Sequence, residues 1–182
     1  MENENNDMIN TCAMSDIDFE FVLDSSGSIL SQNWVTTTEL IAKHWIPLMQ
    51  PNPSPECGNH IAIRRYSSGH YYDLDFNAPS DWSSNGFTNY TEYVANVFKN
   101  LVYMNGGTDT AGALQRVRTE DIQKTRGGTK KIMVFTDGDS NYPEDTKNQA
   151  ELLHPLVDDV FAFGIGQGRD SVLFCFFSGY RS

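Results

Sequence analysis

The sequence predicts an α/β fold: a doubly wound, mostly parallel sheet flanked by helices, with one antiparallel edge strand. Apolar strand-like runs alternate with helix-like periodicities along the chain, as in parallel sheets whose strands are connected through helices. Two of these runs end in an aspartate, Asp24 and Asp137. Two other short runs are separated only by Ser67-Ser68-Gly69-His70, which indicates a hairpin and therefore one antiparallel neighbour.

In the first half, residues 17–23 are rich in strand formers and stop at a cluster of Asp, Ser and Gly. A helix follows, because apolar residues recur at steps of three and four and prolines then close the segment. The residues on its predicted inner face are Trp34, Thr38, Ile41, Trp45 and Leu48. Residues 61–66 and 71–76 form the hairpin, and residues 77–86 are polar enough for a loop.

In the second half, Tyr90, Tyr93, Val97 and Leu101 mark a helix. After Gly106-Gly107 another helix runs from about Thr108 towards Arg118, with Ala113, Leu114 and Val117 inward. Residues 132–136 are an unbroken apolar run, typical of a strand buried on both faces. Leu152, Leu153, Leu156 and Val157 predict a further helix, and residues 160–166 the last strand.

The length of 182 residues suits one domain. We expect a polar extension over 1–15, the domain over 16–168 and an atypical tail over 169–182. A formal net charge of −11 argues against nucleic acid as a partner. No apolar run approaches the ~20 residues that cross a bilayer, so we expect no direct membrane insertion, and the first residues lack the features of a signal peptide.

Cysteines and histidines are too scattered for a zinc site, with Cys12, Cys57 and Cys175 far apart in sequence. The triplet Asn89-Tyr90-Thr91 permits glycosylation if the chain enters a secretory pathway. Triplets of this kind also arise by chance, so the triplet alone does not establish that route.

Oxygen donors gather around the predicted carboxyl ends of the strands. Asp24 and Asp137 follow two strands whose ends share one rim of a parallel sheet, which is the ligand edge of this fold class. Ser26 and Ser28 add hydroxyls beside Asp24, and Thr108 adds a third. Hard oxygens without sulfur or imidazole suit Mg²⁺, with Mn²⁺ or Ca²⁺ as alternatives, and the small number of carboxylates favours Mg²⁺.

At these residues the chain resembles the von Willebrand factor A family, of the integrin I-domain and matrix A-domain type. Its metal-ion-dependent adhesion site is a D-x-S-x-S loop completed by a distant Thr and a distant Asp. The matching segments are Phe21-Val22-Leu23-Asp24-Ser25-Ser26-Gly27-Ser28-Ile29, Gly106-Gly107-Thr108-Asp109-Thr110, Val134-Phe135-Thr136-Asp137-Gly138 and Phe161-Ala162-Phe163-Gly164-Ile165-Gly166. The resemblance covers roughly residues 17–168.

This resemblance implies a complete metal site made of Asp24, Ser26, Ser28, Thr108 and Asp137. It implies a secreted or cell-surface adhesion or matrix-binding module that is not an enzyme, whose bound cation coordinates an acidic residue of an extracellular partner. The family pattern passes over Ser25 and uses Thr110 at most indirectly, so both are expected to be structural. The family's strand order makes a Cys12–Cys57 disulfide feasible, while three reduced thiols remain the alternative.

The chain also departs from the family pattern. Glu20 lies inside the first strand, where we expect it near an open end or paired, because an unpaired buried carboxylate is costly. Only residues 169–182 stand where the family has a helix, a strand and a long closing helix, so we expect a truncated or divergent C-terminus. Asp139 follows a glycine and is expected to belong to a turn.

Two other functions stay open. One is a component of an intracellular metal-dependent enzyme, although no His is predicted at the carboxyl end of a strand to serve as a base. The second is a matrix domain that self-assembles and uses metal for stability alone. Dependence of partner binding on the metal would separate an adhesion module from a scaffold.

Overall fold

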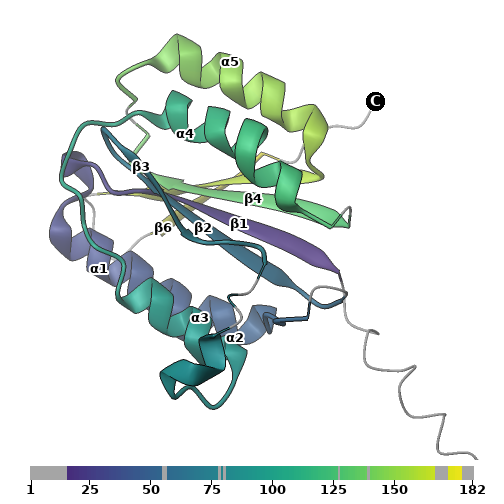
Figure 1. Ribbon diagram of the computed structural model, residues 1–182. Helices are drawn as coiled ribbons and strands as arrows, with labels where there is room; N and C mark the ends of the chain where they lie inside the picture. Colours follow the sequence, from purple (N-terminus) through teal and green to yellow (C-terminus); the bar gives the residue numbers. More distant parts are fainter. Residues whose placement is uncertain are drawn as a thin grey trace, which may run out of the picture.

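The computed structural model describes residues 16–54, 57–77, 79, 81–126, 128–138, 140–166 and, for the backbone, 172–177. It contains a sheet of the order β3-β2-β1-β4-β5-β6 with helices on both faces (Figure 1). The strands are β1 Ile17–Asp24, β2 His60–Tyr66, β3 His70–Leu74, β4 Thr129–Thr136, β5 Asp159–Ile165 and β6 Val172–Phe177. The predicted fold class is therefore confirmed.

The four central strands β2, β1, β4 and β5 run parallel, and β3 pairs antiparallel with β2 as the hairpin predicts. A second antiparallel strand, β6, pairs with β5 at the opposite edge. It falls within the segment 169–182 that we expected as a tail. The expected extension over 1–15 lies outside the described residues.

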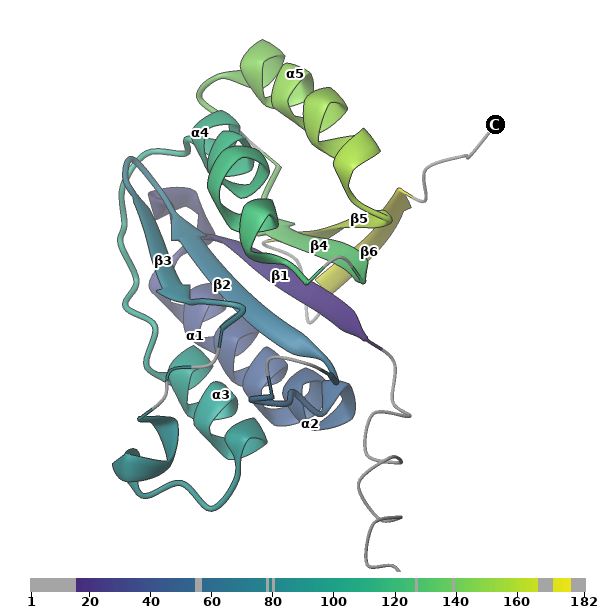
Figure 2. The same cartoon turned by 45° about the vertical axis from the view of Figure 1, so that its right-hand side comes forward.

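The two faces of the sheet carry different helices, as the turned view shows (Figure 2). One face is covered by α1 Ser31–Leu40, α2 Ile46–Met49 and α3 Tyr90–Lys99, and the other by α4 Thr110–Arg116 and α5 Pro143–Leu153. The structure also contains short 3-10 and π-helical turns. The 3-10 turns are η1 Gly27–Ile29, η3 Trp82–Asn85, η5 Ile122–Lys124 and η6 His154–Leu156, and the π-helical turns are η2 Ile41–Trp45 and η4 Val117–Asp121. No helix among these described segments is long and apolar enough to cross a membrane.

The core is divided by the sheet. On the α1 face, Phe21 stacks with Phe135 and meets Phe98 edge-on at 4.9 Å between ring centroids. On the α4 face, Val22, Tyr66 and Ile132 from the sheet form a second cluster with Ala113 and Leu114 of α4. Alternate residues of β1 thus contribute to opposite layers, as the two-residue period of a strand requires.

The helix after β1 differs from its predicted inner face at one residue. Trp34, Thr38 and Ile41 are buried, but Leu48 is 83 % exposed and Ile46 is buried in its place. The cause is η2, a π-helical turn in which the Ile46 amide donates to the Ile41 carbonyl five residues earlier. The wider turn shifts the phase of every later side chain.

Glu20 lies in the middle of β1 and is fully buried, so its expected position near an open end is wrong. It interacts with a pair formed by Arg64 and Asp121, in which the guanidinium donates to both carboxylate oxygens at 2.5 and 2.6 Å. Burial, followed by the charge of Asp121, raises the Glu20 pKa well above its usual range. This shift favours the protonated, neutral form of Glu20 beside the pair of Arg64 and Asp121.

Cys57 is buried and disulfide-bonded. Cys12 lies outside the described residues, and so does the side chain of Cys175. The Cys12–Cys57 pairing therefore stays a prediction.

Candidate functional site

The carboxyl ends of β1 and β4 form one rim of the sheet. The two strands are parallel neighbours, with Leu23 opposite Phe135, so the next residues, Asp24 and Thr136, end the strands together. Asp137 follows immediately. The polar ends of two apolar strands are thereby brought to one place, as the parallel arrangement predicts.

Asp24 is fully buried and held by two hydrogen bonds. One carboxylate oxygen accepts from the Ser26 amide at 2.9 Å, and the other accepts from the Thr136 hydroxyl at 2.8 Å. Burial raises the Asp24 pKa; these hydrogen bonds oppose the rise, and the negative charge of Asp137 adds to it. The fixed carboxylate is thus ready to accept a cation, which would offset its loss of water.

Asp137 has one carboxylate oxygen, Oδ1, that is buried without a hydrogen-bond partner among the residues that the structure describes. Among the described residues, no Lys, Arg or His lies within ion-pair distance of Asp137 or Asp24. Two neighbouring acidic groups without a compensating positive charge are costly in a protein interior. A bound divalent cation would remove that cost.

The loop after β1 brings two hydroxyls beside Asp24. Ser26 is buried, Ser28 is exposed, and their Oγ atoms lie 3.1 Å apart. Tyr103 fixes the loop from outside by donating its hydroxyl to the Ser26 carbonyl at 2.9 Å. Two oxygens so close together suit neighbouring positions around one small cation.

Thr108 belongs to a third loop, which is tied to both others. The Gly27 amide donates to the Gly106 carbonyl at 2.9 Å, which joins this loop to the loop after β1. Thr108 and Asn141 exchange two bonds: the Thr108 amide donates to the Asn141 side chain at 2.5 Å, and the Asn141 amide donates to the Thr108 carbonyl at 2.9 Å. Thr108 is 8 % exposed and is positioned by the segment that follows Asp137.

Gly106 also lies close to the turn between β2 and β3. A Cβ atom there would lie 2.7 Å from the Ser67 hydroxyl and 3.0 Å from the Ser68 hydroxyl. A Cβ contact of 2.7 Å is too short, so a larger residue at Gly106 would require either the two serines or the Thr108 loop to move.

Two nearby residues have the structural roles expected for them. The Ser25 hydroxyl accepts from the Met104 amide at 2.7 Å, and Thr110 lies 3.2 Å from the Tyr66 hydroxyl. Asp139 lies outside the described residues. Sequence reasoning did not single out Thr136 or Asn141: the first is recognisable as a hydroxyl ending an apolar run, whereas nothing in the sequence marks the second.

The chemistry of the rim fits a hard divalent cation. Within the described part of the chain, no three side chains from His, Cys, Asp and Glu come together, so the donors are two carboxylates supplemented by hydroxyls. Such a set offers charge neutralisation without soft ligands and leaves coordination positions for water or a partner.

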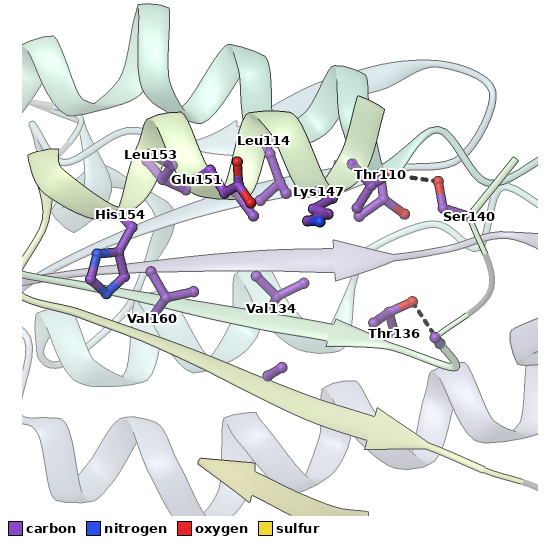
Figure 3. Close-up of a pocket in the computed structure, with 14 residues that line it drawn as sticks. Thr110, Leu114, Val134, Thr136, Ser140, Lys147, Glu151, Leu153, His154 and Val160 are labelled. Atoms are coloured by element: carbon purple, nitrogen blue, oxygen red, sulfur yellow. Dashed lines mark hydrogen bonds between the residues drawn. The ribbon is translucent and has the colours of Figure 1, made fainter. Parts of the chain in front are cut away.

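An apolar cavity of about 700 Å³ lies beside the rim, between α5 and strands β4 and β5 (Figure 3). Leu114, Val134 and Val160 line its interior, while Thr136 closes the end towards the rim and also accepts from the Gly138 amide at 3.1 Å. The cavity is separate from the cluster of oxygen donors, because neither Asp24 nor Ser26 lines it.

The sequence model described as von Willebrand factor type A domain matches residues 18–173 of this chain. Among curated proteins, the chain is 27 % identical over 179 residues to the mouse collagen alpha-1(VI) chain and 25 % identical over 156 residues to bovine vitrin. These alignments cover 90 % and 85 % of this chain but only 16 % and 22 % of the relatives. The chain thus spans a small part of each relative.

Solved structures with the same fold include manganese-loaded TRAP protein of Plasmodium vivax, with a TM-score of 0.67 and 18 % identity over 86 % of this chain and 59 % of that one. Proximal thread matrix protein 1 from the mussel byssus has a TM-score of 0.65 and 22 % identity, covering 85 % of this chain and 39 % of that one. A form of the mussel protein with a zinc-occupied MIDAS motif gives a TM-score of 0.63 at 17 % identity, covering 85 % of this chain and 37 % of that one.

Proposed function

Because this chain belongs to the von Willebrand factor type A domain family, we propose that it is a non-enzymatic, metal-dependent adhesion or matrix-binding module. The proposed metal ligands are Asp24, Ser26, Ser28, Thr108 and Asp137. The proposed partner is an extracellular or matrix protein that presents an acidic residue. The matrix proteins among the relatives support this setting.

One observation carries the proposal: two acidic side chains meet at the rim without a positive charge. Asp24 is fully buried, Asp137 has a buried oxygen without a hydrogen-bond partner among the described residues, and the hydroxyls of Ser26 and Ser28 in the loop after β1 can complete a coordination shell. Protein donors satisfy both Asp24 oxygens, and a structural role alone would give the buried Asp137 oxygen a protein donor as well. The proposed cation is Mg²⁺, replaceable by Mn²⁺; the manganese- and zinc-bound neighbours support a divalent ion.

The bound cation would supply Lewis acidity at the exposed side of the rim. Asp24 and Asp137 neutralise most of its charge, and the hydroxyls of Ser26, Ser28 and Thr108 orient it. A partner's carboxylate can then replace a water ligand. The net charge of −11 weakens binding of the same carboxylate elsewhere on the surface, so recognition concentrates at the metal.

A thermal-shift titration with Mg²⁺ and Mn²⁺ tests the metal site. Saturating metal should stabilise the protein, by about 2.7 kcal/mol at one hundred times the dissociation constant. Asp137→Asn should abolish this gain. Glu39→Gln is the matched control, because it removes the same charge from an exposed position in α1 and should leave the gain intact.

Partner recognition is tested separately with immobilised peptides that present Glu, against twins that present Gln. Binding of the Glu peptides should require Mg²⁺ or Mn²⁺ and disappear in EDTA. Capture that is equal for both peptides and unaffected by EDTA contradicts the adhesion proposal. Self-association that persists in EDTA would favour the scaffold function instead.

A further inference from the structure

The N-terminus of α3 carries a potential modification site that the proposed function does not use. Asn89-Tyr90-Thr91 is the one Asn-x-Ser/Thr triplet without a central proline in the 182-residue sequence. Proline excludes the similar triplet Asn52-Pro53-Ser54. In the structure Asn89 is exposed, so the question is whether the fold admits a large substituent at its side chain.

Asn89 caps α3 in a way that leaves its amide nitrogen available. Its Oδ1 accepts from the Glu92 amide at 2.9 Å, which fixes the carboxamide plane. Its Nδ2 has a single described contact, to the exposed Thr88 hydroxyl at 3.2 Å. A substituent that replaces one Nδ2 hydrogen therefore leaves the capping oxygen in place.

An aromatic group stands two residues before the asparagine. Phe87 is half-buried, and its ring meets Tyr93 edge-on at 5.4 Å and 76°. Tyr90, inside the triplet, stacks with Tyr93 at 5.7 Å. Aromatic faces carry partial negative charge that attracts the C–H groups of a sugar ring, so this cluster offers a surface for the first sugar of a glycan.

The triplet lies away from the proposed metal site. Asn89 shares a surface depression with Pro51, whose backbone bridges to Asn59 just before the start of β2. From there α3 runs along the sheet towards the segment that holds Thr108 (Figure 2). A substituent on Asn89 thus leaves the rim free for a partner.

We propose that Asn89 carries an N-linked glycan whose first sugar packs against Phe87. The inference rests on the extracellular setting of the proposed function and is independent of the metal. Nδ2 forms a bond to C1 of the reducing-end sugar of a lipid-pyrophosphate-linked oligosaccharide. The bond between C1 and the pyrophosphate oxygen breaks, the lipid pyrophosphate leaves, and Nδ2 gives up one proton.

The test expresses the whole chain in eukaryotic cells behind a secretion signal and a linker with its own acceptor triplet. Glycosylation of the linker reports entry into the secretory pathway. The wild-type chain should then carry a second glycan, which peptide N-glycosidase removes while converting Asn89 to Asp. Asn89→Gln and Thr91→Ala should each lose it, and Thr91→Ala retains the helix cap, so its loss is not a folding effect.

Asn85→Gln, an exposed asparagine outside any triplet, is the matched control and should keep the glycan. Phe87→Ala should lower the occupied fraction. A chain whose linker is glycosylated while Asn89 stays unmodified overturns the proposal. Failure of Mg²⁺ to stabilise both the glycosylated chain and Thr91→Ala would contradict the metal site and leave the glycan inference intact, so the two outcomes are distinguishable.

Discussion

The carboxylates of Asp121 and Asp18, below the carboxyl rim, differ from those of Asp24 and Asp137, at the rim, in whether a cationic side chain pairs with them. Below the rim, the Asp121 carboxylate accepts hydrogen bonds from Nε and Nη2 of Arg64, and the Asp18 carboxylate accepts one from Arg126 at 3.0 Å. At the rim, Asp24 and Asp137 have no cationic side chain near them among the described residues. The fold thus pairs the buried carboxylates of Asp121 and Asp18 with its own arginines and pairs neither Asp24 nor Asp137, where a cation is proposed to bind.

The largest expected effect tests the compensated region. Asp121→Ala leaves the Arg64 guanidinium buried without its main partner and should lower the free energy of unfolding by about 3–5 kcal/mol. Glu120→Ala is the control: Glu120 also contacts Arg64, at 3.3 Å, but is 45 % exposed and should contribute about 0–1 kcal/mol. Urea unfolding measures both. Equal losses of stability in the two variants would show that Asp121 is not the main partner of the buried Arg64 charge.

Thr136→Val tests how the rim holds Asp24. It removes the donor to one Asp24 oxygen and should cost about 1.5–3 kcal/mol, the range for hydrogen bonds to charged groups, with weaker Mn²⁺ binding. Thr110→Val loses only a neutral contact with Tyr66 and should cost about 0.5–1.5 kcal/mol without altering metal affinity. Denaturant unfolding and metal titration compare the variants. Unchanged metal affinity in Thr136→Val would show that metal binding does not depend on the hydrogen bond that positions Asp24.

When no metal is present, Asp137→Asn should raise the free energy of unfolding, whereas the substitutions above lower it. Because the Asp137 charge raises the Asp24 pKa, removing it relieves a repulsion, and in EDTA the variant should be more stable than wild type by up to about 1 kcal/mol. Calorimetry at neutral pH measures the difference. A clear loss of stability in EDTA would mean that Asp137 already has a stabilising partner in the protein.

The effect of Glu20→Gln on the free energy of unfolding should be small at pH 5 and should grow as the pH rises. The folded-state pKa of Glu20 is raised, so between its ordinary pKa of about 4.3 and the folded value the native state binds a proton that the unfolded state releases. Wild-type stability therefore falls as pH rises, by at most about 1.4 kcal/mol per pH unit. Gln at this position should flatten that slope in unfolding curves from pH 5 to 8, whereas Glu39→Gln should not.

Local pattern was sufficient for most of the fold. The runs before Asp24 and Asp137 are apolar enough to be strands on composition alone, and their parallel direction follows from the alternation of strands and helices. The shared rim of the two aspartates is a consequence of that parallel direction, whereas the direct pairing of β1 with β4 was not predicted. The antiparallel hairpin was likewise predictable from the short turn between its strands.

What the sequence could not reveal depended on contacts between distant segments. The π-turn that exposes Leu48 is invisible to a fixed helical period, and the partner of Glu20 lies about a hundred residues away, on η4. No local sequence pattern marks Asn141, because its role is to hydrogen-bond to a loop more than thirty residues earlier. Such positioning residues require the assembled structure.

The adjacency of β1 and β4 has a mechanical consequence. A pull on a partner held at the rim enters the domain at the carboxyl ends of these two strands, which lie next to each other inside the sheet. On its other side, β1 pairs in parallel with β2, and β4 pairs in parallel with β5. Load directed along the strands therefore shears several hydrogen-bond ladders at once instead of peeling one bond at a time, so the fold resists tension applied through its proposed binding site.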